Sequence, residues 1–190
     1  MEKAVFFDRD GTLIQEMNYL RRIEDIHPYE GAAEGIRLLR RLGYKIIVVS
    51  NQSGVARGYF TMETVETINR AFQEIFQSLN APIDAVYFCP HHPKGIVSEY
   101  AIDCDCRKPK IGLAEEAQRD FDLDLTRCFM VGDKQSDIEF GQNFHARANV
   151  LVKTGHGVEQ PAEIGADFVA QDIQEACRWI DKQTQRKGCY

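Results

Sequence analysis

Short continuous runs of apolar residues, separated by helical patterns, are the feature of this sequence that most restricts its fold. Four such runs occupy Ala4–Phe7, Ile46–Val49, Phe129–Val131 and Val150–Val152, and a further strand is expected at Ala85–Phe88. Because the four runs are continuous and do not alternate apolar with polar residues, they are typical of strands that are covered on both faces in a parallel sheet.

The segments between these runs predict helices. The strongest pattern follows Thr61, a good N-terminal capping residue, and repeats apolar side chains about every 3.6 residues from Met62 to Leu79. Further helices are predicted at Ala32–Leu42, Ile111–Phe121, Ser136–Phe144 and Asp172–Gln185. This alternation predicts a single α/β domain over residues 1–190 with a doubly wound, mostly parallel sheet, in which ligands bind beyond the carboxyl ends of the strands. The tail 182–190 is expected to be frayed.

The charge of the chain argues against some classes of partner. Its 29 acidic and 23 basic residues give a formal net charge of −6, so its long-range field repels nucleic acid and anionic membranes. No apolar stretch approaches the about 20 residues of a membrane span, and the N-terminus lacks the pattern of a signal peptide. We therefore expect a cytoplasmic monomer without nucleic-acid or membrane partners, which must hold any anionic ligand in a local site.

Polar side chains follow the predicted strands at the places where a parallel sheet binds its ligands. Four segments have this placement, and they contain Asp8 and Asp10, Ser50, Lys108, and Asp133. Taken alone, each segment has an ordinary explanation: an Asp-Gly turn, a polar loop, a solvated basic pair or a helix cap. Their order along the chain is more informative than any one of them.

Taken in that order, the four segments resemble the motifs of the haloacid dehalogenase (HAD) superfamily of phosphotransferases. These motifs are Asp-x-Asp after the first strand, Ser or Thr after the second, then a Lys, then Gly-Asp, and the resemblance spans most of the chain. It implies that Asp8 is the nucleophile, that Asp10 is the general acid and base, and that Ser50 and Lys108 stabilise the phosphoryl group. Covalent catalysis of this kind divides one difficult displacement into two easier ones.

The same resemblance implies a magnesium ion at these strand ends. The ion would be held by the carboxylates of Asp8 and Asp133 and the main-chain carbonyl of Asp10, with Lys134 beside it. A need for cations also follows from charge alone, because a carboxylate and a phosphate dianion repel each other. Magnesium together with Lys108 would supply positive charge between them in a partly dry pocket.

A second metal site is predicted from the spacing of cysteine and histidine. Cys89, His91, Cys104 and Cys106 form two short pairs on either side of a loop, and four soft ligands suit tetrahedral zinc. His92 is a rival to His91, and unrelated reduced thiols are the alternative to a metal site. With no open coordination position the zinc would be structural, and this loop, at about residues 89–107, would hold the basic pair that ends it.

The residues around the zinc loop narrow the resemblance from the superfamily to one family within it. Cys-Pro-His-His-Pro, Cys-Asp-Cys-Arg-Lys-Pro and Asn-Gln-Ser-Gly-Val-Ala-Arg-Gly are similar to segments of the heptose bisphosphate phosphatases, which act in nucleotide-activated heptose synthesis. This implies removal of the 7-phosphate from D-glycero-D-manno-heptose 1,7-bisphosphate. Arg107 is expected on the distal phosphate, because a planar guanidinium can bind it through two hydrogen bonds. The implied substrate-binding residues are Asp8, Arg9, Asp10, Glu16, Met17, Asn18, Tyr19, Ser50, Asn51, Gln52, Ser53, Arg107, Lys108 and Lys134.

Other functions stay open at this point. A histidinol-phosphate phosphatase resembles the chain in the Asp-x-Asp and zinc motifs. A phospho-acceptor receiver domain has a similar sheet, but its acceptor aspartate follows the middle strand, and a zinc-stabilised interaction module would lack phosphatase activity. No long insertion follows the first two motifs, so no separate cap domain is expected. Gly155-His156-Gly157 is interpreted as a turn, because it lacks the strand-glycine-helix spacing of a phosphate loop.

Overall fold

The computed structural model describes residues 1–161 and 164–185 of the chain. At its centre is a six-stranded sheet in which neighbouring strands run parallel. The strands are β1 (Ala4–Phe7), β2 (Lys45–Asn51), β3 (Ala85–Cys89), β4 (Phe129–Gly132), β5 (Ala148–Val152) and β6 (Phe168–Ala170). Their order in space is β3-β2-β1-β4-β5-β6, so the direction of winding reverses between β1 and β4. The predicted doubly wound α/β fold is confirmed.

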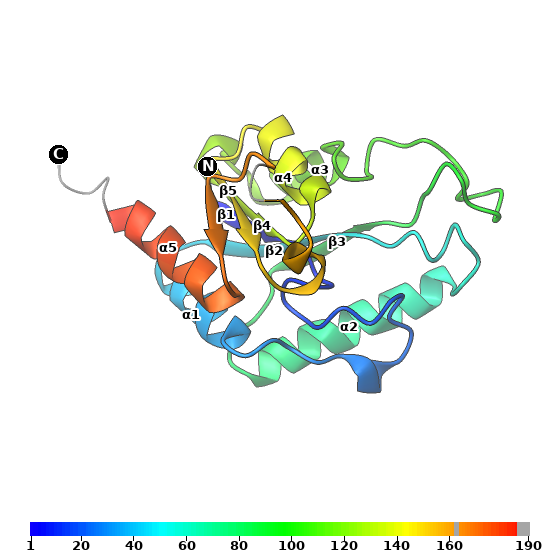
Figure 1. The fold of residues 1–190 in the computed structure, drawn as a ribbon, viewed down its shortest axis with the longest axis horizontal. Helices are drawn as coiled ribbons and strands as arrows, with labels where there is room; N and C mark the ends of the chain where they lie inside the picture. The colour runs from blue at the N-terminus through cyan, green and yellow to red at the C-terminus, as the bar shows by residue number, and fades with distance from the viewer. Residues whose placement is uncertain (162–163, 186–190) are drawn as a thin grey trace.

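Helices cover both faces of this sheet (Figure 1). They are α1 (Ala32–Arg41), α2 (Met62–Ser78), α3 (Gly112–Phe121), α4 (Gln135–Asn143) and α5 (Ile173–Gln185). Helices α1, α2 and α5 share one apolar core with the sheet, and α3 and α4 share a second core on its other face. Among the described residues, no helix combines the length and the apolar character needed to cross a membrane.

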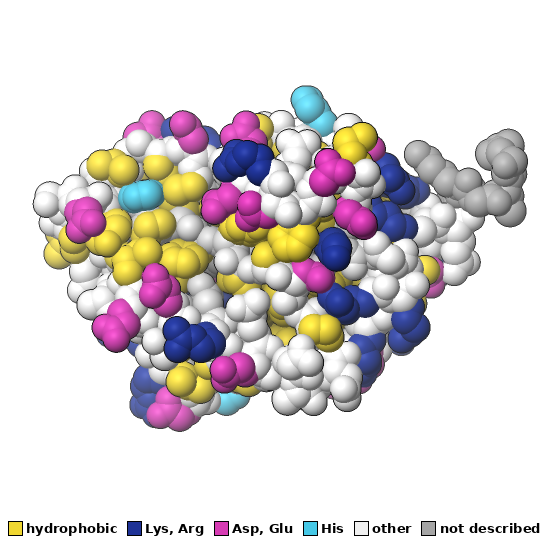
Figure 2. Space-filling model, turned by 180° about the vertical axis from the view of Figure 1, so that it is seen from behind, with side chains coloured by type: hydrophobic (Ala, Val, Ile, Leu, Met, Phe, Trp, Pro, Cys, Tyr) yellow, Lys and Arg dark blue, Asp and Glu magenta, His cyan; other side chains and the backbone are white. Residues whose placement is uncertain are grey.

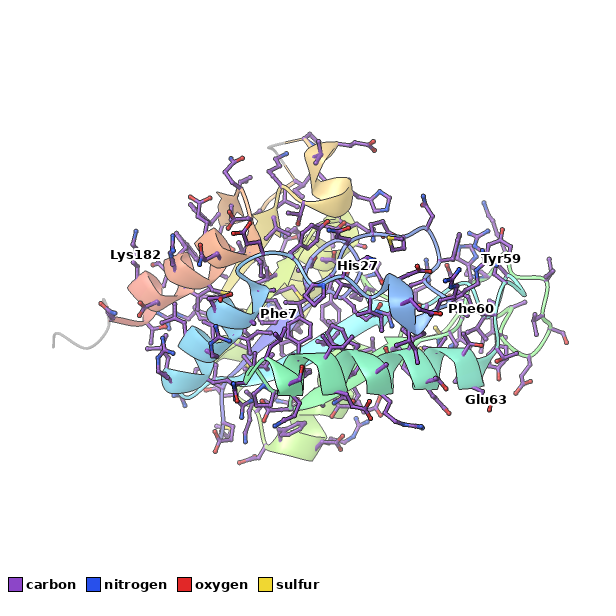
Figure 3. The ribbon with its side chains drawn as sticks, turned by 90° about the horizontal axis from the view of Figure 1, so that it is seen from below. Phe7, His27, Tyr59, Phe60, Glu63 and Lys182 are labelled. Atoms are coloured by element: carbon purple, nitrogen blue, oxygen red, sulfur yellow. The ribbon has the colours of Figure 1, made fainter. Side chains whose placement is uncertain are left out.

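The alternation of side chains along β1 explains why both faces are covered. Phe6 belongs to the core with α3 and α4, whereas Phe7, labelled in Figure 3, belongs to the core with α1, α2 and α5. Both rings are fully buried, and burial of such a side chain contributes about 1.5–3 kcal/mol. These two anchors place the next residue, Asp8, at the carboxyl end of the strand.

The predicted helices agree with the observed bounds to within one residue at each end. Thr61 caps α2 as predicted, since its Oγ1 accepts a hydrogen bond of 3.2 Å from the main-chain N–H of Thr64. Strand β6 was not predicted, because three residues at the sheet edge, two of them only partly buried, give no distinct pattern. Residues 182–185 of the tail that was expected to be frayed belong to α5, and 186–190 lie outside the described residues.

Candidate active site

A cavity of about 330 Å³ lies at the carboxyl ends of the central strands, where doubly wound sheets bind their ligands. The predicted site residues that line it are Asp8, Asp10, Glu16, Asn18, Tyr19, Ser50, Asn51, Gln52, Ser53, Arg107, Lys108 and Lys134. Three other predicted residues, Arg9, Met17 and Asp133, do not belong to its wall. The cavity therefore gathers three cations in a chain that is acidic as a whole.

Lys108 joins three parts of the site. Its Nζ donates hydrogen bonds of 2.7 Å to Asp8 Oδ1 and to the main-chain oxygen of Val49, and it lies 2.7 Å from Asp137 Oδ1. Burial would lower the pKa of Lys108, but Asp137 and Asp8 outweigh burial and raise it, so the amine stays charged. Asn51 also fixes the main chain of Lys108, accepting from its N–H at 3.0 Å and donating to its oxygen at 3.1 Å.

Three buried carboxylates meet beneath the cavity. One oxygen each of Asp8, Asp133 and Asp137 lies within 4.8 Å of the other two. Burial, together with the charge of Asp8, raises the pKa of Asp133 to about 8, and burial also raises the pKa of Asp137. Burial would likewise raise the pKa of Asp8, but Lys108 and Lys134 outweigh it and hold that pKa below its ordinary value. Because three acids face two lysines, the cluster favours a further cation.

Asp133 has one carboxylate oxygen held and the other left for a ligand. The main-chain N–H of His156 donates to Oδ2 at 2.8 Å, whereas Oδ1 lies 3.7 Å from Lys134 Nζ and accepts no hydrogen bond from the described residues. A Cβ at Gly11 or Gly155 would overlap Oδ2, so both close approaches require glycine. A buried oxygen without a donor, beside two other carboxylates, fits a hard cation such as Mg²⁺.

Asp10 lies at the cavity wall and is held by two neighbouring side chains. Arg9 donates from Nε and Nη2 to both carboxylate oxygens at 2.8–3.3 Å. Gln52 Nε2 donates to Asp10 Oδ2 at 2.9 Å and to Ser50 Oγ at 2.7 Å. The guanidinium of Arg9 is buried and does not line the cavity, and the substrate contact that the resemblance implied for Arg9 stays a prediction.

The loop that follows β1 forms one side of the cavity mouth. Glu16 Oε2 lies 3.6 Å from Lys134 Nζ and 3.4 Å from His156 Nε2, so it links this loop to the turns after β4 and β5. The ring of Tyr19 packs edge-on against that of Tyr59, with centroids 4.7 Å apart. Tyr59 lies near the start of α2, at the opposite end of the molecule from α5 (Figure 3). These contacts hold the loop at two places.

The four predicted zinc ligands, Cys89, His91, Cys104 and Cys106, lie together. Cys104 Sγ lies 3.5 Å from Cys89 Sγ and 3.3 Å from Cys106 Sγ, and His91 Nδ1 lies 3.3 Å from Cys106 Sγ. The three cysteines are free of disulfide bonds. Three thiols and an imidazole that converge in this way fit tetrahedral zinc.

The structure favours His91 over its neighbour as the metal ligand. His92 Nε2 lies 3.1 Å from Arg57 Nη2, and its Nδ1 accepts a hydrogen bond from the main-chain N–H of Lys94, so its ring is engaged outside the cluster. Arg107 Nη1 donates to the main-chain oxygen of His91 at 3.2 Å. The cluster is thus connected to a cation of the cavity wall.

Four residues of the cavity wall were not predicted, Leu20, Ser136, Asp137 and His156, and two of them contact the buried carboxylates or their partners. Asp137 lies in the first turn of α4, where an acid usually acts as a helix cap, and its Oδ2 does accept a hydrogen bond of 3.0 Å from the main-chain N–H of Lys134. Its position four residues after Asp133 was the sequence signal that it could also belong to the cluster of buried carboxylates. His156 belongs to a segment interpreted as a turn, and the main-chain hydrogen bond through which it orients Asp133 has no sequence signature.

Comparison with known proteins agrees with this geometry. Residues 105–176 match a family described as HAD-hydrolase-like. The D-glycero-beta-D-manno-heptose-1,7-bisphosphate 7-phosphatase of Haemophilus influenzae is 38% identical over 182 residues, which are 96% of this chain and 98% of that protein. The chain belongs to the heptose bisphosphate phosphatase family of HAD-like hydrolases.

Other members of the heptose bisphosphate phosphatase family extend the comparison. The D-glycero-alpha-D-manno-heptose-1,7-bisphosphate 7-phosphatase of Photorhabdus laumondii is 38% identical over 161 residues, covering 85% of this chain and 88% of its own. The crystal structure of D,D-heptose 1,7-bisphosphate phosphatase from B. bronchiseptica, complexed with magnesium and phosphate, superposes with a TM-score of 0.82. It is 26% identical and covers 96% of this chain and 99% of its own. The family resemblance predicted from the motifs is confirmed.

Proposed function

We propose that this protein removes the 7-phosphate of D-glycero-D-manno-heptose 1,7-bisphosphate through a phosphorylated aspartate, as a step in the synthesis of nucleotide-activated heptose. The observation that carries this proposal is the carboxylate of Asp8, which faces the cavity and is bound by a buried ammonium, Lys108, at 2.7 Å. The names of the similar proteins support a heptose bisphosphate over histidinol phosphate. Asp10 lies next to the proposed nucleophile Asp8 and can act as acid and base, so a phosphorylated Asp8 would be hydrolysed. This favours turnover over the stable phosphorylation of a receiver domain.

The chemistry divides between two aspartates. Asp8 forms a bond to phosphorus as the bond from phosphorus to the sugar oxygen breaks, and Asp10 gives its proton to that leaving alkoxide. In the second step Asp10 takes a proton from water, the water oxygen bonds to phosphorus, and the bond to Asp8 breaks. Lys108, which already contacts Asp8, and Ser50 at the end of β2 bind the phosphoryl oxygens as charge develops on them.

A magnesium ion completes the charge balance of the proposed site. The residues that would hold it are Asp8, Asp133 and Asp137 together with the main-chain carbonyl of Asp10, and Lys134 lies beside them. When bound, the ion neutralises charge on the phosphate, so that a carboxylate can approach it. The buried and unpaired Oδ1 of Asp133 supports this assignment.

We also propose that the second cluster holds structural zinc. Its four ligands fill a tetrahedral shell, so no position is left for a reacting group. Arg107 is bonded to the main chain of His91, and it directly follows Cys106 in the chain. Zinc would therefore support Arg107 and Lys108, two of the three cations of the cavity wall, without taking part in the reaction.

Cys104→Ala is expected to lower zinc content and thermal stability together, and to reduce kcat about 10-fold or more, because Arg107 and Lys108 lose their support. Cys128→Ala is the matched control, since the buried thiol of Cys128 has its hydrogen-bond partners in the main chain of Ala4 and Asp124 and not among the four ligands. It should lower stability and leave zinc content unchanged. Zinc per chain and the melting temperature are measured for both. Wild-type protein that is purified under reducing conditions without zinc, yet is stable and active, would end the zinc proposal.

The distal phosphate of the substrate is assigned to Arg107, which lines the cavity beside Lys108. Arg107→Ala is expected to lower kcat/KM for the heptose bisphosphate by about 2–3 kcal/mol, or roughly 30- to 150-fold, because a charge-assisted contact is lost. The loss for the 7-monophosphate should be much smaller, and Arg107→Lys should be intermediate because it keeps the charge without the fork. Equal losses of kcat/KM for both substrates would mean that Arg107 does not bind the distal phosphate.

The substrate itself is tested with the wild-type protein. Both anomers of the heptose bisphosphate, the 7-monophosphate and histidinol phosphate are ranked by kcat/KM in the presence of magnesium. We expect a heptose bisphosphate to rank first by at least about tenfold, since each 1.4 kcal/mol of selective binding gives that factor. Preference for histidinol phosphate, or the absence of any hydrolysis, would overturn it.

We also propose that the protein is a monomer that acts in the cytoplasm on a small sugar phosphate, without nucleic-acid or membrane partners. The net charge of −6 supports the part that concerns nucleic acid. Figure 2 shows acidic and basic side chains interspersed over one face of the molecule. An anionic substrate is therefore held by the local cations of the cavity and not by a general basic surface.

A further inference from the structure

Arg9 is a charged residue buried in a place where charge is costly. It is 1% exposed and is among the largest fully buried side chains of the chain. Its Nε and Nη2 face the carboxylate of Asp10, and its Nη1 donates a hydrogen bond of 2.6 Å to Asn69 Oδ1. A buried guanidinium is stable only when its donors are paired, so both partners are needed to keep it in this position.

Asn69 is a polar residue on the buried, mainly apolar face of α2. It lies on the buried face of α2 beside the apolar residues Val65, Ile68 and Phe72, and it is 7% exposed. An amide in such a position is destabilising unless it is hydrogen-bonded, and its Oδ1 is bonded to Arg9. The contact joins α2 to the loop after β1 across 60 positions of the chain.

The two oxygens of Asp10 are held unequally. Oδ2 accepts three hydrogen bonds, from Arg9 Nη2 at 2.8 Å, from Gln52 Nε2 at 2.9 Å and from Arg9 Nε at 3.1 Å. Oδ1 accepts only two, both from Arg9, at 3.1 Å from Nη2 and at 3.3 Å from Nε. The fork of Arg9 prevents the carboxylate from turning, so Oδ1 is the oxygen left to exchange a proton with the leaving alkoxide and then with water.

We infer that Asn69 is a positioning residue which, through the buried guanidinium of Arg9, fixes the carboxylate of Asp10 for proton transfer. Arg9 then acts behind Asp10 and does not bind the substrate. This inference rests on the proposed phosphatase function but not on the identity of the sugar, because it concerns the proton that any alkyl phosphate ester requires at its leaving oxygen.

The test compares a substrate whose leaving group requires a proton with one whose leaving group does not. Asn69→Leu removes the acceptor at similar size, Asn69→Asp keeps an acceptor, and Ile68→Val is a control on the same face of α2 that lacks the contact with Arg9. Each is assayed with an alkyl phosphate and with 4-nitrophenyl phosphate, whose phenolate leaves without a proton. Because general acid–base catalysis contributes about 10²–10⁴-fold, Asn69→Leu is expected to lower kcat for the alkyl ester about 10- to 100-fold with KM unchanged.

With 4-nitrophenyl phosphate the same variant should show a burst of phenolate at the wild-type rate, followed by slow turnover, because only the water step still needs Asp10. Asn69→Asp should restore kcat to within about threefold of wild type, and Ile68→Val should change stability without changing kinetics. Should Asn69→Leu fail to fold, Asn69→Ala serves in its place. Unchanged kcat in the Asn69 variant, or an equal loss in the burst and in alkyl ester hydrolysis, would overturn the inference. Wild-type protein that hydrolyses aryl and simple alkyl phosphates but no heptose bisphosphate would overturn only the proposed substrate.

Discussion

Asp8→Asn is expected to abolish turnover while leaving the protein folded. The amide has the shape of the carboxylate, and its oxygen can still accept the 2.7 Å hydrogen bond from Lys108, whose second acidic neighbour Asp137 remains. Stability should therefore fall by no more than about 2 kcal/mol. Activity should fall at least about 10⁴-fold, because loss of a covalent nucleophile leaves only binding and electrostatic contributions. The specific rate and the free energy of unfolding are measured on the same preparation.

Two observations separate this role of Asp8 from a purely structural one. A rapidly quenched wild-type reaction should carry phosphate on the peptide that contains Asp8, and the Asp8→Asn variant should carry none. A substrate made chiral at phosphorus with oxygen isotopes should react with overall retention, because two in-line displacements each invert the centre. Overall inversion would mean that water attacks the substrate directly, and the covalent route would be wrong.

The parts of the site that depend on one strand end could be predicted from the sequence. Asp8 and Asp133 directly follow β1 and β4, Asp10 comes two residues after Asp8, and a parallel sheet brings such strand ends to one edge. The positions of the helices and of the central strands could also be predicted, since each of their patterns lies within a single segment of the chain. Strand β6 has only three residues, and so it had no such pattern.

The parts that depend on contacts between distant segments could not be derived from the residues alone. Lys108 and Asp8 are 100 positions apart, and their pairing was implied only by the family resemblance. Asn69 resembles any polar residue in a helix until the fold places Arg9 against it. His91 and His92 have the same chemistry, and only the path of the chain turns one ring into the cluster and the other away from it.

Several charged side chains are buried together in this site. Their burial makes the site reactive, but it also destabilises the folded protein. Asp8, Asp133 and Asp137 are each at most 4% exposed, and their mutual repulsion contributes to the raised pKa of Asp133 and of Asp137. Lys108 is the one described cation that lies 2.7 Å from two of these acids. Its removal should therefore affect stability more than removal of any one carboxylate.

Lys108→Met is accordingly expected to lower both activity and stability. The thioether fills a similar volume, but it leaves Asp8 and Asp137 buried without their cation, which costs about 3–5 kcal/mol in the metal-free protein. Turnover should fall about 10²–10³-fold or more, because the charge next to the transferring phosphoryl group is lost. Magnesium should restore part of the stability, since it binds the stranded carboxylates in the folded state only.

Two further variants isolate the buried charge as the cause. Lys110→Met removes an exposed lysine two positions away, whose contacts with Asp103 and Asp105 lie in solvent, and it should change stability little. The double variant Asp8→Asn with Lys108→Met should be more stable than Lys108→Met alone, because one stranded carboxylate is gone, although it stays inactive. Unfolding free energies are measured with and without magnesium. If metal-free Lys108→Met is as stable as wild type, these carboxylates are accommodated without Lys108, and its role is confined to the reaction.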